Sequence, residues 1–580
     1  MQRDVYEFIS QKTNDPIVDW KQCVDTGEEF WIFASDLQFY DTISPIVDGQ
    51  KYPLPTPQYS PNQRLRRRLS YKNERTLYKR TCDLTGKSIL SIYGPHVPGP
   101  VYNTQDRRSD KRNPLDFGEE IDKNKTFFEQ FAAFRAKVPK IAILNDNGTN
   151  SENIAYCQNL AYSKDCYLTT VSWKLENVFY SSNMSWGEWL IDCFFVMDSY
   201  HCYECRDSYN LYGCFWLADS WDCKNCRMGQ DLLGCQDCIW CIGLRNKKYC
   251  VFNEQYTPEA FTEYMQAFKK ELLDDKDWLL KKFHAFVQIK PHKAMNIING
   301  DTAYGSNLVN AKDIVSCFNV KNIRECKYCM FGDGMSFSMD LTVGGEQQRC
   351  YESITPDFCY KALFTIFCWS CTDVWYSDMC HGCKDCFWCI GLKNQQYCIF
   401  NKQYSKNNYY VTIAKIIKNM QKDNEWWEFF PRQDSPFYYN ESAAQDYFPR
   451  DKKEVETSWW KRLDTFADIN IPDRVAFIPA STLPIDPHQC LDTIADTPIQ
   501  CQETGRLYRI LQKELDFYRK RDIPLPRIHH DQRCLYRVQS MPNKDLFLRD
   551  CSKTGEKILS VYPSDVWFPV WSKQAYDLQI

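Results

Sequence analysis

The feature that most constrains this chain is an internal repeat of cysteine positions. The segment CFFVMDSYHCYECR at 193–206 reappears as CFWLADSWDCKNCR at 214–227, and the cysteines, an Asp-Ser pair and the final arginine keep a spacing of 21 residues. A fixed period of this size is typical of proteins whose repeats stack on one another. The same spacing links two series of cysteines: Cys193, Cys214 and Cys235, and Cys329, Cys350 and Cys371.

These repeats predict a parallel β-solenoid with about 21 residues per coil. They are rich in Phe, Tyr, Trp, Val and Cys and lack helical periodicity, which suits coils stacked at about 4.8 Å. The Cys-x-x-Cys pairs would be small buried side chains near a corner. Asp198-Ser199 and Asp219-Ser220 would form a column of turns, because both residue types bond to nearby backbone amides.

The solenoid sequence is itself duplicated. CIWCIGLRNKKYCVFNEQY at 238–256 matches CFWCIGLKNQQYCIFNKQY at 386–404, an offset of 148 residues. A helical pattern follows each copy, the first beginning near Pro258. We expect these helices to cap an open end of each solenoid, because an uncapped end exposes unpaired strand edges.

The two ends of the chain are also related to each other. QCVDTGEEFWIFASDLQFY at 22–40 resembles QCQETGRLYRILQKELDFY at 500–518, and CDLTGKSILSIY at 82–93 resembles CSKTGEKILSVY at 551–562. Each pair begins with Cys-x-x-Thr-Gly and lies at an offset of 478 or 469 residues. Two homologous α+β modules that resemble zinc knuckles therefore flank the solenoids.

We therefore expect a mainly β protein with helical caps, divided into seven segments. These are an N-terminal knuckle module (1–115), a helical connector (116–150), the first β-solenoid (151–256), a helical cap and linker (257–300), the second β-solenoid (301–405), a helical cap and Trp/Pro-rich connector (406–480), and a C-terminal knuckle module (481–580).

Composition describes an ordinary folded chain. Of 580 residues, 44% are hydrophobic and 25% charged, with a net charge of -4, which excludes wholesale disorder and indicates no partner. The N-terminal stretch resembles neither a secretory signal nor a transit peptide, and no apolar run approaches the roughly 20 residues that cross a bilayer. We expect a cytoplasmic protein with no membrane partner, in which the 30 cysteines are reduced, buried or bound to metal.

The Cys-x-x-Thr-Gly motif resembles a zinc knuckle whose second ligand is threonine, since structural zinc is usually held by four Cys or His side chains. The N-terminal module offers only Cys23 and Cys82, which do not complete such a site. The C-terminal module predicts one zinc ion, and the alternative is a polar loop at the adjacent histidines. Its candidate ligands are Cys501, Cys551, His529, His530 and Cys534.

Closely spaced cysteines also suggest iron–sulfur ligation, which we consider a weaker prediction than zinc. Two series are similar to the ligand runs of bacterial ferredoxins: Cys235, Cys238 and Cys241, and Cys380, Cys383, Cys386 and Cys389. Both lack the more distant Cys-Pro, and both belong to the repeat already described.

A cluster of basic residues in the first module predicts contact with phosphates. The alternative is a solvated face beside an acidic partner surface. The candidate nucleic-acid ligands are Arg64, Arg66, Arg67, Arg68, Lys72, Arg75, Lys79 and Arg80.

A resemblance to a known family rests on TGRLYRILQKELDFYRKRDIPLPRIHHDQR at 504–533. This stretch looks like a module of the cysteine-rich, zinc-ribbon-like repeat proteins with degenerate knuckles that are common in candidate-phyla bacteria. The resemblance implies the modular architecture and no particular activity. It departs from the family pattern at Ser60-Pro61 and His530-Asp531, where that pattern has ligands. The stretch at 82–87 is also similar to knuckles of small ribosomal proteins, which implies contact with RNA.

The chain contains no phosphate-binding glycine-rich loop, Gly-x-Ser-x-Gly or His-Glu-x-x-His motif, so we predict no catalytic residues. The leading hypothesis is a non-catalytic scaffold that presents basic knuckle modules to a large partner such as a nucleic acid or ribonucleoprotein. The alternatives are a metalloprotein that uses the Cys-x-x-Cys ladders and a self-associating structural protein of a shell or particle. A carbohydrate-acting enzyme, suggested by fold analogy alone, is a distant fourth.

Overall fold

The chain folds into two units, each assembled from segments that are far apart in the sequence. The computed structural model describes residues 1–109, 113–458, 460–464 and 476–579; residues 459 and 465–475 of the predicted Trp/Pro-rich connector lie outside them. Unit 1 joins Met1–Ile143, Ala294–Arg462 and Pro542–Val566, and unit 2 joins Leu144–Lys293, Leu463–Met541 and Trp567–Ile580. The N-terminal module therefore belongs with the second β repeat, and most of the C-terminal module with the first.

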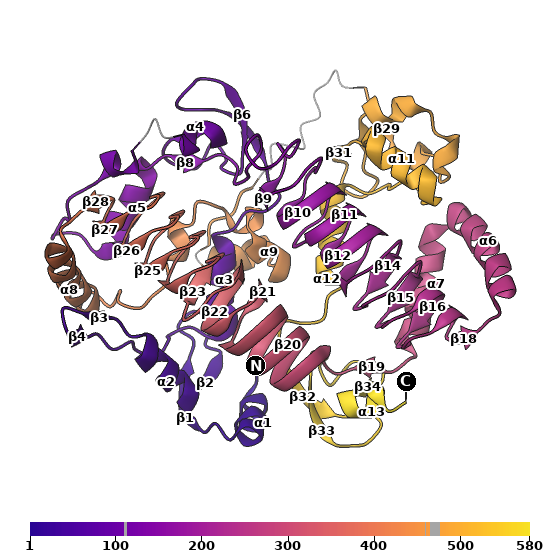
Figure 1. The fold of residues 1–580 in the computed structure, drawn as a ribbon, viewed down its shortest axis with the longest axis horizontal. Helices are drawn as coiled ribbons and strands as arrows, with labels where there is room; N and C mark the ends of the chain where they lie inside the picture. Colours follow the sequence, from indigo (N-terminus) through magenta and orange to yellow (C-terminus); the bar gives the residue numbers. More distant parts are fainter. Residues whose placement is uncertain (110–112, 459, 465–475, 580) are drawn as a thin grey trace. The chain divides into compact units, whose positions relative to one another are not determined.

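Unit 2 contains a ten-stranded sheet whose strands follow one another in chain order (Figure 1). All neighbours are parallel except the last pair, which forms a hairpin. The strands are β9 (Gln158–Ala161), β10 (Thr170–Phe179), β11 (Ser185–Ile191), β12 (Phe194–Tyr203), β13 (Arg206–Tyr209), β14 (Phe215–Ala218), β15 (Arg227–Gln230), β16 (Gln236–Ile242), β17 (Lys248–Val251) and β18 (Glu254–Gln255).

Unit 1 contains a nine-stranded sheet of the same kind. Its first strand winds instead of running straight (Figure 1). The strands are β20 (Ile297–Lys327), β21 (Met330–Asp333), β22 (Ser336–Gly345), β23 (Tyr351–Ile354), β24 (Tyr360–Leu363), β25 (Thr372–Trp375), β26 (Lys384–Phe387), β27 (Gln396–Ile399) and β28 (Lys402–Gln403). The expectation of a mainly β chain with large parallel sheets is confirmed.

Residues paired on neighbouring parallel strands lie a constant 12 positions apart in the sequence. Trp173 pairs with Ser185, which pairs with Met197, and Phe318 pairs with Met330 in the other sheet. The same step joins the hydroxyls of Thr170 and Ser182, which lie 12 residues apart in the sequence and 2.7 Å apart in space. The longer period predicted from the cysteines is therefore wrong. Both 12 and 21 are multiples of three. A repeated cysteine shows that two positions are equivalent within the repeat, but it does not show how many residues separate two paired strands.

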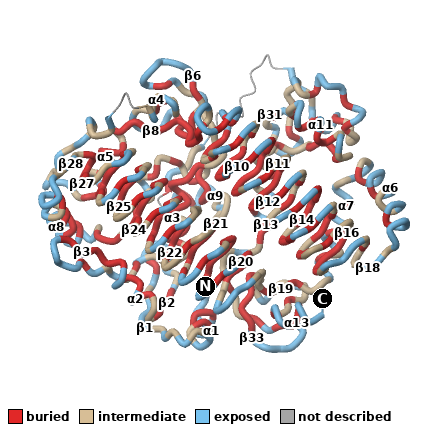
Figure 2. The backbone as a smooth tube through the Cα atoms, viewed as in Figure 1, coloured by how far each residue is buried: buried red, intermediate tan, exposed pale blue. Residues whose placement is uncertain are grey.

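The backbone of both sheets turns at every third residue. Asn159, Tyr162, Asp165 and Leu168 have φ between 47° and 53°, and the residue after each of them is buried. This third position supplies the core of both sheets, where small and aliphatic side chains predominate; the buried residues follow the strands in Figure 2. All 30 cysteines are buried free thiols.

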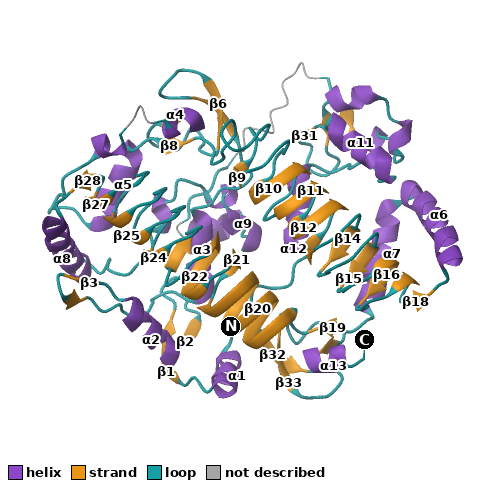
Figure 3. Ribbon diagram, in the orientation of Figure 1, coloured by secondary structure: helices purple, strands orange, loops and turns teal. Residues whose placement is uncertain are grey.

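Helices follow both β repeats, as predicted (Figure 3). In unit 2, α6 (Pro258–Asp274) contacts β17 and α7 (Lys276–Gln288) contacts β15 and β16. Phe268 and Phe283 of these helices pack edge-on or tilted against Trp240, with ring centroids 5.7 and 6.0 Å away. In unit 1, α8 (Lys406–Lys422) contacts β27.

The Cys-x-x-Thr-Gly motif forms the same turn at all four of its positions. In each, the cysteine N–H donates to the residue five positions later and the glycine N–H donates to the cysteine carbonyl. The glycines have φ of 69–73°, a left-handed conformation that favours glycine. The flanking hairpins are β1–β2 (Ile17–Gln22, Glu29–Phe33), β5–β6 (Tyr78–Thr81, Ser88–Ser91), β30–β31 (Ile499–Gln500, Leu507–Tyr508) and β32–β33 (Phe547–Asp550, Lys557–Ser560).

The remaining elements complete the end modules and connectors. Unit 1 has α1 (Arg3–Thr13), α2 (Ala34–Ile43), α3 (Pro61–Ser70), α4 (Thr104–Arg108), α5 (Phe127–Lys137), α9 (Ala443–Tyr447), α10 (Lys452–Thr457) and the strand pairs β3–β4 (Ile46–Val47, Gln50–Lys51) and β7–β8 (Val101–Tyr102, Lys140–Ile141). Unit 2 has α11 (Gln512–Arg521), α12 (His530–Gln539), α13 (Lys573–Asp577), β29 (Ile478–Pro479), β19 (His292–Lys293) and β34 (Val570–Trp571). None of the described helices is long and apolar enough to cross a membrane.

Candidate functional site

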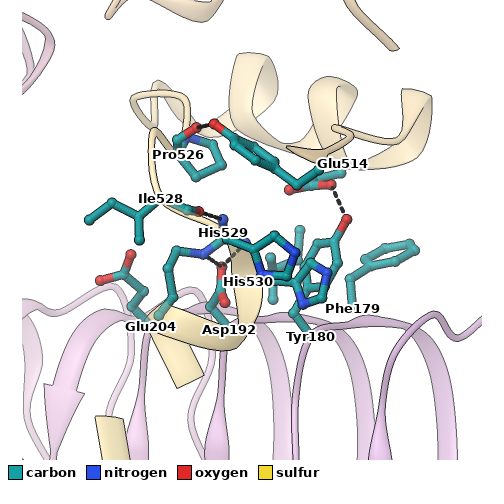
Figure 4. A network of polar contacts seen from close by, with 12 residues as sticks. Phe179, Tyr180, Asp192, Glu204, Glu514, Pro526, Ile528, His529 and His530 are labelled. Carbon is teal, nitrogen blue, oxygen red and sulfur yellow. Dashed lines mark hydrogen bonds and ion pairs between the residues drawn. The ribbon is translucent and has the colours of Figure 1, made fainter. Parts of the chain in front are cut away.

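Helix α12 packs against a column of side chains on the ten-stranded sheet. Tyr180, Asp192 and Glu204 occupy equivalent left-handed positions on successive turns of the repeat and lie on the same side of the sheet (Figure 4). The nine-stranded sheet repeats this column, at the offset of 148 residues, as Tyr328, Asp340 and Glu352. The duplication therefore preserves an aromatic residue followed by two acids.

Two arginines of α12 bind the first acid of this column. Arg533 places Nε 3.0 Å and Nη2 2.9 Å from Asp192 Oδ2, and Arg537 places Nη1 3.0 Å from Oδ1. The arginines lie four residues apart and so share one helix face. Burial alone would raise the pKa of Asp192, but the two guanidinium groups lower it below the ordinary value.

Helix α3 makes the corresponding contact in unit 1. Arg64 Nε lies 2.8 Å from Asp340 Oδ2, and Arg68 Nη1 lies 3.3 Å from Oδ1. Arg64 and Arg68 correspond to Arg533 and Arg537 at the offset of 469 residues. We call each set of two arginines and one aspartate an arginine clamp. Comparison of the two ends of the sequence revealed the related modules that carry these arginines. Their acid partners, Asp192 and Asp340, lie in the β repeats, and no nearby sequence motif marks them.

A buried carboxyl group stands beside the clamp of unit 2 (Figure 4). Glu514 accepts hydrogen bonds from the hydroxyls of Tyr180, at 3.1 Å, and Tyr518, at 2.6 Å. Burial raises the pKa of Glu514 to about 7, and the positive charge of Arg533 only partly opposes this effect. Glu514 can therefore gain or lose a proton near neutral pH, and the hydroxyls of Tyr180 and Tyr518 contact its carboxyl group.

The structure brings His529 and His530 together with Asp531, a residue that the sequence prediction missed. One possible ligand atom from each lies within 4.8 Å of the others. His529 Nδ1 accepts a hydrogen bond from the backbone N–H of Asp531 at 3.2 Å, and Asp531 Oδ2 lies 2.8 Å from Arg506 Nη1. Burial lowers the pKa of His529 to about 2, so its imidazole is neutral.

The other predicted zinc ligands do not join this group. Cys501 Sγ instead accepts backbone hydrogen bonds from His529, at 3.2 Å, and Thr504, at 3.4 Å. Cys534 lies buried on α12, and Cys551 belongs to unit 1. A closed structural zinc site needs four ligands, and the three donors grouped in unit 2 do not supply them. Their existing hydrogen bonds and the neighbouring Arg506 also fit a metal-free role.

The cysteine ladders are packed as thiols. Cys238 and Cys241 donate to the carbonyl oxygens two residues earlier, at 3.3 and 3.2 Å. Burial raises the pKa of Cys166 to about 12, whereas side-chain hydrogen bonds with Cys226, Cys235 and Cys241 lower the pKa of Cys238. Among the described residues, no group of three clustered ligands includes a cysteine. Iron–sulfur ligation at Cys235, Cys238 and Cys241 stays a prediction.

Most of the side chains predicted to bind phosphate already contact other residues of unit 1. Arg64, Arg67, Arg68 and Lys72 are buried, and only Lys79 of the eight is exposed. Their partners include acids from other elements, so a phosphate contact by these side chains requires the loss of an ion pair. The further contacts are Arg67 with Glu428 (3.1 Å), Lys72 with Glu74, Arg75 with Asp446 (2.5 Å), Arg80 with Asp83 (3.4 Å), and Arg66 over the Phe448 ring (4.9 Å).

Comparison with known proteins adds no family to this description. No protein-family model matches the chain, and no curated protein sequence is significantly similar to it.

Proposed function

We propose that this protein is a non-catalytic binding scaffold built on two four-sided β-solenoids. The step of 12 recurs on four sides of the first repeat: Gln158 with Thr170, Trp173 with Ser185, Glu176 with Glu188, and Tyr167 with Phe179. Four left-handed positions per step supply four corners, and three residues form each side. A closed coil of this kind presents long, regular outer faces.

The observation that carries the scaffold proposal is the repeated arginine clamp. Arg533 and Arg537 hold the C-terminal module on Asp192, and Arg64 and Arg68 hold the N-terminal module on Asp340. A buried charge contact that occurs in both copies is a structural joint. The basic helices therefore fasten the end modules to the solenoids, and the outer solenoid faces remain for a partner.

Hydrogen exchange of the full chain tests the joint. We expect Arg533→Ala with Arg537→Ala to speed amide exchange in α11 and α12 more than in the strands β12–β17. Unchanged exchange in α11 and α12 would contradict the proposal that the clamp holds this module.

Nucleic acid is the partner that the burial of the basic cluster disfavours. Each phosphate contact contributes a salt dependence with a slope of about -0.9 in log affinity against log salt. We expect fluorescence anisotropy with a single-stranded RNA and a duplex DNA to give weak binding and a shallow slope. Tight binding with a steep slope would instead support the nucleic-acid hypothesis and require the clamps to open.

Self-association is separated from this proposal by static light scattering. A molar mass that stays at that of one chain, 68.7 kDa, over a wide concentration range argues against a shell or particle subunit. Concentration-dependent growth would favour one.

A further inference from the structure

The first solenoid carries an exposed aromatic residue on each of five consecutive coils. The five side chains lie on two adjacent sides of the coil and expose between two fifths and half of their surface. They are Tyr162 (49%), Trp173 (39%), Trp186 (52%), Tyr200 (44%) and Tyr212 (47%). We call this set the aromatic track.

The strand register gives the track its direction. Trp173 is one coil beyond Tyr162, because it pairs with Ala161, and Ser185 beside Trp186 pairs with Trp173. Tyr200 pairs with Glu188 on the coil of Trp186, and Tyr212 forms a bridge with Tyr200. With coils about 4.8 Å apart, the five rings extend over about 20 Å. This length suits a linear ligand more than a compact one.

Two close contacts order three of the five rings of the track. The centroids of Tyr162 and Trp173 lie 4.5 Å apart, and Lys174 Nζ lies 3.8 Å from the centroid of Trp186. Rings ordered in this way lose little conformational entropy when a ligand binds.

The second solenoid shows that the coil does not require these rings. At the offset of 148 residues, four of the five equivalent positions carry no aromatic side chain, although the same backbone is formed there. The equivalents are Asn310, Lys321, Gly334, Gln348 and Tyr360. Large exposed apolar side chains cost solubility without contributing to a core, so their presence on one copy indicates a binding surface.

Charge on the track identifies the class of ligand. Lys164 pairs with Glu176, Glu176 with Glu188, and Glu188 with Tyr200 of the track. Lys174 and Asp198 occupy the same left-handed corner as Tyr162 and Trp186 on other coils. Neither sign of charge dominates, so a polyanion would meet as much repulsion as attraction. Tyrosine and tryptophan rings pack against the C–H faces of pyranose sugars, and carboxylate groups accept hydrogen bonds from sugar hydroxyls. We propose that the aromatic track binds a linear, uncharged polysaccharide. This inference rests on the scaffold proposal and names its ligand.

Affinity electrophoresis of the full chain tests this inference with soluble neutral probes: hydroxyethyl cellulose, starch and galactomannan. We expect at least one probe to retard the wild-type protein, and Trp173→Ala with Trp186→Ala to weaken this retardation by about tenfold or more. The matched control is Trp278→Ala on α7. Trp278 has the same 52% exposure as Trp186, and Lys282 lies 5.0 Å from its ring, but it is outside the track.

The outcomes separate the ligand from the scaffold proposal. No retardation by any neutral probe, or equal weakening by Trp278→Ala, would overturn the polysaccharide inference and leave the clamp experiment unaffected. Tight binding of a protein or a nucleic acid that is lost with the track variant would also overturn it, while the scaffold proposal would stand.

Discussion

Arg533 and Asp192 lie 341 positions apart in the sequence, yet Arg533 Nη2 is 2.9 Å from Asp192 Oδ2 in the interior of unit 2. Removing one partner of a buried ion pair costs about 3–5 kcal/mol when the other charge is left without compensation, but Arg537 still pairs with Asp192 when Arg533 is removed. We therefore expect Arg533→Ala to lower the free energy of unfolding by the smaller amount of about 1.5–3 kcal/mol, typical of hydrogen bonds to a charged group, in urea titrations.

Lys573→Ala is the matched control for this variant. Lys573 of unit 2 pairs with Asp577, and their side chains are 55% and 38% exposed; exposed pairs contribute at most about 1 kcal/mol. Equal losses for Lys573→Ala and Arg533→Ala would contradict the assignment of Arg533 to a buried clamp.

Glu514 predicts a pH dependence of stability. Burial raises its pKa from 4.5 to about 7, so the folded protein holds the proton more tightly than the unfolded chain. The stability from this group is complete below pH 4.5 and is lost as the pH rises to about 7, a change of up to about 3 kcal/mol. Glu514→Gln should flatten this part of the curve measured by urea unfolding.

A second buried acid, Glu352 of unit 1, supplies the control for this pH dependence. Burial also raises the pKa of Glu352 to about 7, so a slope that persists in Glu514→Gln but disappears in the double variant with Glu352→Gln assigns the remainder to unit 1. An unchanged slope in the double variant would refute the prediction.

The cysteine core predicts that the native protein hides its thiols. All 30 are buried, so a chromogenic thiol reagent should react with them only as the chain unfolds, and every one of them should react in guanidinium chloride. Reaction rates should follow the rate of unfolding. Rapid labelling of the ladder cysteines in the native state, mapped by mass spectrometry, would contradict the packed core.

Two glycines of unit 1 allow the cost of backbone strain to be compared with the cost of a steric clash. Gly86 has a φ of 72° and no atom within 4 Å of an added Cβ, whereas an added Cβ at Gly99 would lie 1.8 Å from the Ala136 carbonyl oxygen. We expect Gly86→Ala to cost about 1 kcal/mol and Gly99→Ala more than about 3 kcal/mol. Thermal unfolding of both variants measures the difference, and similar costs would show that the close approach at Gly99 relaxes.

Metal analysis of anaerobically purified protein tests the predictions of zinc and iron. The three donors grouped at His529, His530 and Asp531 lead us to expect less than stoichiometric zinc. About one zinc per chain that disappears in Cys501→Ser would instead support the knuckle prediction. Stoichiometric iron would support the ladders as ligands.

The sequence alone was sufficient for features that depend on local or repeated patterns. The offsets of 148 and 469 residues, the four Cys-x-x-Thr-Gly turns and the burial of the cysteines all follow from which residues recur. A turn such as that at Gly86 is predictable because its hydrogen bonds join residues five or fewer positions apart.

The tertiary structure decided which distant segments meet. The cysteines recur at 21 residues in the sequence, whereas residues paired on neighbouring strands lie 12 positions apart, and only the strand pairing reveals the second spacing. Likewise, the charge pattern of Arg64 and Arg68 indicates an acidic partner or a phosphate, and the choice of Asp340 depends on packing across 272–276 positions of sequence. Local patterns specify which side chains are buried, whereas the partner of a buried charge is selected by the whole fold.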